Sequence, residues 1–192
     1  MNLLDTETGI SLACGSLERI FVGFSWRWNP VIRFIKQEID DCRFGEIQYA
    51  SLTAREWVPK IAANAWIESG SHILDTARFL FAGQTEYKTF YWIDSPIITH
   101  LNDDVSKGQF VSGLLDIGGP KGFVAQIHVN CCNECEYEYR IVIQGSCRSA
   151  TYSLKPDPRM LHLEMQSFLG DQQGLATLAD GIENVRLLAA GL

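Results

Sequence analysis

Five strand-like segments follow one another in the second half of this chain, and this run constrains the fold more than any other feature. Each segment is rich in aromatic and β-branched residues, as β-strands are. The segments are Tyr87 to Ile93, Gln109 to Ile117, Gly122 to Asn130, Glu136 to Gln144 and Ser149 to Leu154. Gly118-Gly119-Pro120 and Asn133-Glu134 have the composition of hairpin connections. Strands joined in this way predict an antiparallel sheet.

Helical patterns precede and follow these strands. An N-cap residue, Asn29, is followed by Pro30, and this pair predicts a helix that starts near Pro30 and stops by Gly45. Shorter strands are expected at Ile20 to Phe24 and at Glu46 to Ala54. Further helices are expected over Trp66 to Ala82, Pro158 to Phe168 and Leu175 to Ala190. The last is expected to turn Leu178, Ile182, Val185 and Leu188 or Ala189 inward.

The expected fold class is therefore α+β, with a large, mainly antiparallel sheet and helices packed on one face. The other face is open for substrate or subunit contact, and aromatic residues such as Tyr91, Phe110 and Phe123 are candidates for it. Residues 1–19 form an N-terminal segment, a remnant or a linker, and residues 20–192 form one domain.

Charge and hydropathy exclude several classes of partner. A formal net charge of -7 and a pI near 5.1, without a stripe of Lys and Arg, argue against nucleic acid. No segment reaches the roughly 18 apolar residues of a membrane span, and the N-terminus has acidic residues where a secretory signal needs basic ones. A cytoplasmic protein with a small-molecule or protein partner is expected, and its six cysteines are expected mostly as thiols.

Three titratable residues lie at helical spacing in the segment Glu68-Ser69-Gly70-Ser71-His72-Ile73-Leu74-Asp75. Glu68 and His72 are four apart and His72 and Asp75 are three apart, which places them on one face of a helix. A carboxylate can orient such a histidine, which then moves a proton on or off a substrate hydroxyl. The alternative is a solvated helix surface without chemistry.

Arg27 lies between two tryptophans where a strand is expected to lead into the helix at Pro30. Its guanidinium could bind an anionic or polyol substrate. Equally, it could stack on a tryptophan in a purely structural cation-aromatic pair.

A cysteine cluster offers a third candidate site. Cys131, Cys132 and Cys135 include a Cys-x-x-Cys spacing, and Cys147 follows nearby. A zinc site would need a second pair of ligands that the sequence does not clearly provide, so no metal is predicted. Glycine-rich phosphate-binding motifs are also missing from the sequence, so no nucleotide site is predicted within this chain.

Four motifs in series resemble the glucose-fructose oxidoreductase/inositol dehydrogenase family. They are Val22-Gly23-Phe24-Ser25-Trp26-Arg27-Trp28-Asn29-Pro30, Phe44-Gly45-Glu46-Ile47, the run from Gly70 to Leu80 with its His-x-x-Asp-x-x-Arg pattern, and the stretch from Glu164 through Asp180 to Val185. The resemblance covers most of residues 20 to 190. It implies the substrate-binding and oligomerisation domain of an NAD(P)-dependent oxidoreductase that acts on a sugar, a polyol or a related hydroxy compound.

The resemblance also assigns roles. It makes His72 the proton donor and acceptor at the substrate carbinol, with Glu68 in the position where many relatives have a supporting aspartate. Asp75 and Arg27 would shape the substrate site. The dinucleotide-binding domain of relatives, with its Glu-Lys-Pro segment, would lie upstream of Met1. NAD or NADP is therefore expected only with a separate or upstream dinucleotide-binding domain, and the isolated chain is expected to be inactive.

Two other functions remain open from the sequence. A non-enzymatic dimerisation or small-ligand-binding protein derived from the same domain would form homo-oligomers through the open sheet face. A regulatory module would bind metal at the cysteine cluster.

Overall fold

A computed structural model provides the structure, and it describes residues 20–56, 69–81, 86–101, 104–118, 123–131 and 137–189. Within them, six strands form one sheet in the order β3-β4-β5-β2-β6-β7. Their bounds are β2 Ile47–Glu56, β3 Glu86–Leu101, β4 Asp104–Gly118, β5 Phe123–Cys131, β6 Glu138–Gly145 and β7 Ser149–Leu154. All neighbouring strands of this sheet are antiparallel except β2 and β5, which are parallel. The predicted α+β class is confirmed.

The position of β2 was not predicted from the sequence. Leu52 on β2 pairs with Ile127 of β5 on one side and with Ile141 of β6 on the other. The strands β5 and β6 are therefore not neighbours, and the predicted hairpin between them is wrong, although Asn133-Glu134 itself lies outside the described residues. Turn residues indicate where the chain reverses, but they do not determine whether the flanking strands pair.

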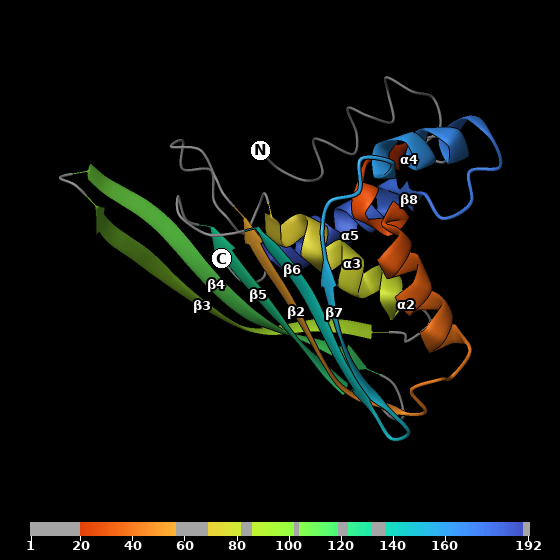
Figure 1. Cartoon of the computed structure of the whole chain (residues 1–192), viewed down its shortest axis with the longest axis horizontal. Helices are drawn as coiled ribbons and strands as arrows, with labels where there is room; N and C mark the ends of the chain where they lie inside the picture. The colour runs from red at the N-terminus through yellow and green to blue at the C-terminus, as the bar shows by residue number, and fades with distance from the viewer. Residues whose placement is uncertain are drawn as a thin grey trace.

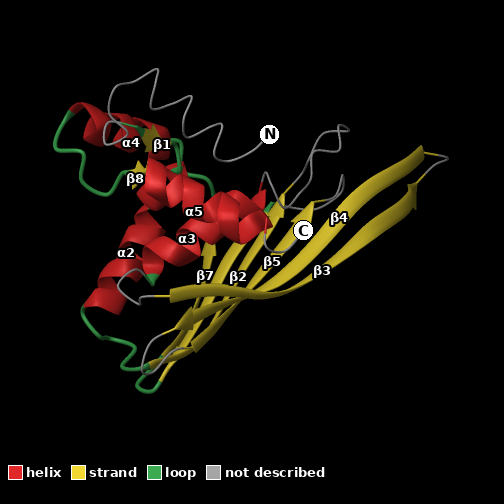
Figure 2. Ribbon diagram, turned by 180° about the vertical axis from the view of Figure 1, so that it is seen from behind, coloured by secondary structure: helices red, strands yellow, loops and turns green. Residues whose placement is uncertain are grey.

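The helices all lie on one side of the large sheet, as Figures 1 and 2 show. Their bounds are α2 Pro30–Asp40, α3 Ser71–Leu80, α4 Met160–Leu169 and α5 Leu178–Ala189, and a short 3-10 helix, η2, covers Ser25–Trp28. Strands β3 and β4 extend beyond the helices at one end of the molecule. None of the helices in the described ranges is both long and apolar enough to cross a bilayer.

Helix α2 begins as the sequence predicts. The Asn29 side chain accepts a hydrogen bond of 3.0 Å from the backbone N–H of Val31, and Pro30 occupies the first turn. This cap satisfies one of the backbone donors that a helix start leaves without a partner. Ile32 and Ile35 are buried beneath the helix.

The core forms between the helices and alternate residues of the central strands. These inward residues are Ala50, Leu52, Ala54, Ala125, Ile127, Val129, Tyr139, Ile141 and Ile143. On the helix side of this core, α3 contributes Ile73, Leu74 and Ala77. Phe123 belongs to this covered face and meets Phe81 edge-on at 5.0 Å, so its predicted place on the open face is wrong.

A second, two-stranded sheet joins the start of the described chain to its end. Strand β1, Phe21–Val22, pairs antiparallel with β8, Ala176–Thr177, directly before α5. In α5, the predicted inward residue Val185 is 45% exposed, whereas the polar residue Asn184 is 1% exposed. Leu188 is buried as predicted, so the prediction is wrong at Val185, and Asn184 belongs to the buried face because it has hydrogen-bond partners there.

Candidate active site

Helix α3 carries the candidate catalytic histidine close to its start. His72 is the second residue of the helix and is partly buried, and its ring meets Phe24 edge-on with 5.9 Å between the ring centroids. Its Nδ1 atom is buried and has no hydrogen-bond partner in the described part of the chain. Glu68, the predicted supporting carboxylate, lies outside the described residues.

Arg27 and Asp75, the two predicted substrate-binding residues, contact each other. Arg27 Nε donates to Asp75 Oδ2 at 2.8 Å and Arg27 Nη2 donates to Asp75 Oδ1 at 2.6 Å. Their side chains are 8% and 0% exposed. The structure thus joins η2 to α3 by a buried, two-pronged ion pair, and the Arg27 guanidinium also lies 5.5 Å from the centroid of the Phe79 ring.

Burial and charge act in opposite directions on this pair. Burial lowers the pKa of Arg27, but the hydrogen bond and charge of Asp75, with a further contribution from Asp180, raise it above its usual value. Burial raises the pKa of the Asp75 carboxyl, and the bonds from Arg27 oppose that change. Removing one partner of such a pair destabilises the fold, because the other charge is then buried without compensation.

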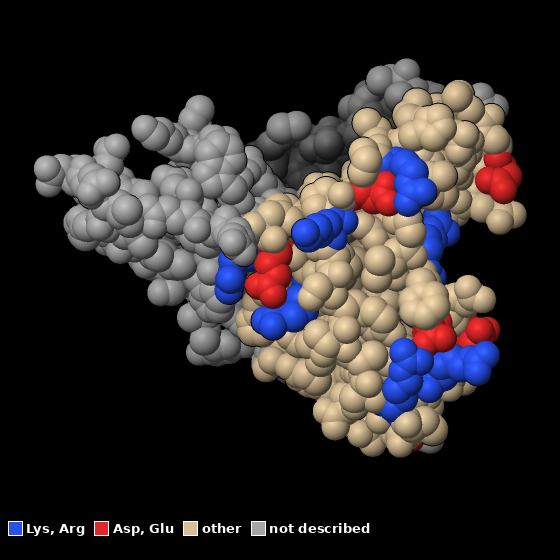
Figure 3. Space-filling view, in the orientation of Figure 1, with Lys and Arg blue, Asp and Glu red and all other residues tan. Residues whose placement is uncertain are grey.

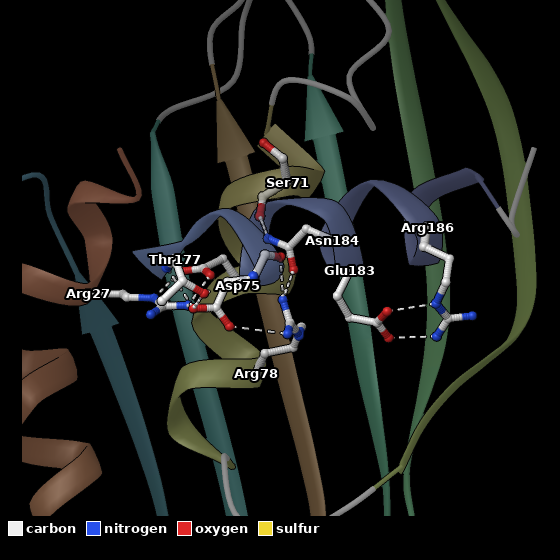
Figure 4. Close-up of polar contacts among 9 residues, drawn as sticks. Arg27, Ser71, Asp75, Arg78, Thr177, Glu183, Asn184 and Arg186 are labelled. Atoms are coloured by element: carbon white, nitrogen blue, oxygen red, sulfur yellow. Dashed lines mark hydrogen bonds and ion pairs between the residues drawn. The ribbon is translucent and has the colours of Figure 1, made fainter. Parts of the chain in front are cut away.

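Helix α5 adds a second set of polar contacts to α3, as Figure 4 shows. Arg78 Nη1 donates to the backbone oxygen of Asp180 at 2.7 Å and to Asn184 Oδ1 at 2.8 Å. Arg27 Nη2 lies 3.5 Å from Asp180 Oδ2. The carboxylate of Asp180 also accepts from the backbone N–H of Thr177 at 2.9 Å, in a capping arrangement at the start of α5. Asp180 Oδ1 lies 3.3 Å from Arg78 Nη2, so one carboxylate links the end of β8 to both arginines.

Aromatic stacking fixes η2 against the sheet. The Trp26 ring stacks on Tyr139 of β6 with 4.1 Å between centroids and an interplanar angle of 16°. The hydroxyl of Tyr139 lies 3.3 Å from Thr76 Oγ1, which donates to the backbone oxygen of His72 at 2.9 Å. Strand β6 therefore supports the same turn of α3 that bears the histidine.

Glu164 of α4 is a buried carboxylate close to the Arg27–Asp75 pair. Burial, and then the charge of Asp75, raise the pKa of Glu164 above its usual 4.5, while Arg27 opposes the change. An unfolded chain ionises this carboxyl above about pH 4.5, whereas the folded chain keeps the proton to a higher pH. The carboxyl therefore destabilises the fold increasingly as the pH rises through this range.

Replacing Glu164 with glutamine should remove that penalty. Relative to the parent, the variant Glu164→Gln should gain stability as the pH is raised from about 4 to about 7, measured by urea unfolding. Glu183→Gln is a matched control, because the hydrogen bond from Arg186 lowers the pKa of Glu183. The control should lose relative stability over the same range, and an identical pH response of the two variants would contradict the assignment.

The cysteine cluster lies mostly beyond the described chain. Cys132 and Cys135 are outside it, Cys131 ends β5, and Cys147 is an exposed thiol. Among the described residues, no three His, Cys, Asp or Glu side chains are arranged to hold a metal ion.

Four residues that interact with α3 or with the Arg27–Asp75 pair were not singled out from the sequence as site residues. Tyr139, Glu164, Asp180 and Asn184 come from β6, α4 and α5, far from His72 in the chain. The capping pair Thr177 and Asp180 is a local signal that could have marked the start of α5. The other three are brought to α3 by tertiary packing alone.

Comparison with solved structures identifies the fold, whereas no protein-family model and no curated protein matches the sequence. A myo-inositol dehydrogenase from Corynebacterium glutamicum aligns with a TM-score of 0.67 and 16% identity over 97% of this chain and 66% of its own. A scyllo-inositol dehydrogenase from Lactobacillus casei with bound NAD(H) and scyllo-inositol aligns with a TM-score of 0.67 and 14% identity. This alignment covers 98% of this chain and 65% of the dehydrogenase. A myo-inositol dehydrogenase from the same organism, in complex with NAD(H) and myo-inositol, aligns with a TM-score of 0.65 and 18% identity. This alignment covers 88% of this chain and 57% of the dehydrogenase.

These alignments cover almost all of this chain but less than two thirds of each dehydrogenase. The similarity therefore concerns a part of those proteins, which agrees with the extent of the resemblance seen in the sequence. This chain has the fold of the larger part of the inositol dehydrogenases.

Proposed function

We propose that this chain is the substrate-binding and catalytic side of an NAD(P)-dependent oxidoreductase that acts on a sugar, a polyol or a related hydroxy compound. The observation that carries the proposal is the placement of His72 at the start of a helix that a buried ion pair and a second helix anchor. A rigid support of this kind is what a proton-transferring group requires. The shared fold with inositol dehydrogenases supports the class of substrate.

In this proposal, His72 accepts the proton of the substrate hydroxyl while the adjacent carbon becomes a carbonyl carbon. NAD or NADP, when bound, would supply the hydride acceptor for that carbon. Glu68 is the proposed supporting carboxylate of the imidazole. Arg27 and Asp75 shape the substrate site from the side of η2, with their own pairing holding α3 at a fixed distance.

A separate or upstream dinucleotide-binding domain supplies the cofactor in this proposal. The alignments support this proposal, because most of this chain aligns with only part of each dehydrogenase, and two of those solved structures contain NAD(H). The exposed apolar side chains of α4 offer a surface for such an association, where Figure 3 shows mostly uncharged surface. They are Leu161, Met165, Phe168 and Leu169.

The open sheet face is the proposed surface for homo-oligomers. Its described residues are polar as well as apolar: Tyr49 donates to Gln126 Oε1 at 2.7 Å, and Arg55 lies 3.5 Å from Glu138. A surface of this composition suits solvent and a partner subunit equally. Size-exclusion chromatography with light scattering distinguishes a monomer from a dimer or tetramer.

The proposed function is tested by assaying the oxidation of myo-inositol and scyllo-inositol with NAD and NADP. The chain alone should give no turnover, and the chain combined with a dinucleotide-binding half should give turnover that depends on His72. Turnover that is the same with and without this chain would contradict the proposal.

A further inference from the structure

Asn184 of α5 connects the two ends of α3 from a buried position. Its Oδ1 accepts from Arg78 Nη1 at 2.8 Å, and its Nδ2 donates to the backbone oxygen of Ser71 at 3.3 Å. The residue is 1% exposed, so both bonds are shielded from water. Figure 4 shows its side chain between Ser71 and Arg78.

The contact with Ser71 matters because it acts next to His72. Ser71 is the first residue of α3, and no side chain caps this helix start. The backbone directly before it is also helical, with residues 69 and 70 in a π-helical turn. The contact from α5 therefore fixes the turn from outside, one residue before the histidine.

The opposite end of the connection is also firmly held. Arg78 Nη1 donates to the backbone oxygen of Asp180 as well as to Asn184, so α3 and α5 are joined at more than one point. A displacement of the Asn184 side chain would consequently move the start of α3, while the end of α3 at Arg78 stays bonded to Asp180 of α5.

We propose that Asn184 is a positioning residue for His72. It holds the first turn of α3 so that the imidazole keeps its edge-on contact with Phe24 and its direction toward the substrate. The inference rests on the proposed function, in which His72 carries the proton. A misplacement of about 1 Å at such a group can lower the rate about 100-fold.

Two variants separate the two bonds of this side chain. Asn184→Asp keeps an oxygen for Arg78 but loses the N–H donor to Ser71, whereas Asn184→Ala loses both. The neighbouring variant Val185→Ala is the matched control, because Val185 is exposed on the same helix. The imidazole C–H resonance of His72, assigned with His72→Gln, reports the position of its ring beside Phe24 in the full chain.

We expect the His72 resonance to move by more than its linewidth in both Asn184 variants and to stay in place in the control. In the assembled enzyme, Asn184→Asp should lower kcat about 10- to 100-fold and leave KM nearly unchanged. If Asn184→Ala fails to fold, the aspartate variant decides the matter.

An unchanged His72 resonance in folded Asn184→Asp would overturn the inference, whether or not His72 transfers the proton in catalysis. Full activity of His72→Gln in the assembled enzyme would instead overturn the proposed function while leaving the measured displacement intact. The two failures are therefore distinguishable.

Discussion

Replacing His72 with glutamine should lower kcat of the assembled oxidoreductase about 10²- to 10⁴-fold, the usual contribution of a general acid or base. Glutamine retains hydrogen-bonding capacity and similar size but cannot take the hydroxyl proton, so substrate binding should change much less than turnover. The measurement is steady-state oxidation of an inositol, with kcat and KM determined separately.

His162→Gln is the control for that experiment. His162 lies on α4 with its side chain exposed, and the same substitution there should leave kcat unchanged. An unimpaired His72→Gln enzyme would show that the proton leaves by another route and would remove the chemical basis of the proposed function.

Replacing Arg27 with methionine should lower the free energy of unfolding by about 3–5 kcal/mol, because it leaves the Asp75 carboxylate buried without its main partner. Loss of the bidentate bonds also frees η2 from α3. The measurement is urea unfolding followed by tryptophan fluorescence, which Trp26 and Trp28 make sensitive to this region.

The exposed pair Arg186 and Glu183 provides a control with similar geometry. Its bonds of 2.6 and 2.7 Å are as short as those of Arg27, but the Arg186 side chain is 55% exposed. Arg186→Ala should cost no more than about 1 kcal/mol, since solvent screens the pair.

The double variant Arg27→Met, Asp75→Leu should recover most of the loss from Arg27→Met, because it removes both charges together. Equal losses from the two arginine variants would contradict a special role for the buried pair.

Local signals in the sequence predicted the helices well. The start of α2 follows from Asn29 and Pro30, whose effects act over a few residues. The α+β class followed from the change between helical and alternating patterns along the chain. These features depend on neighbours in sequence, which a single sequence reveals directly.

Long-range pairing could not be predicted in the same way. The insertion of β2 between β5 and β6 depends on contacts across about half of the chain. Arg27 and Asp75, separated by 48 residues, were each predicted for the site, but their mutual bond was not. The burial of Asn184 in place of Val185 has the same origin, because a polar residue is buried only when distant partners satisfy it.

Calorimetric titration of the 192-residue chain with NAD and with NADP tests the central claim most directly. No saturable binding of either cofactor is expected, because the proposed function assigns dinucleotide binding to another domain. Saturable binding at micromolar concentrations would contradict the account, since it would show that this chain forms a cofactor site of its own.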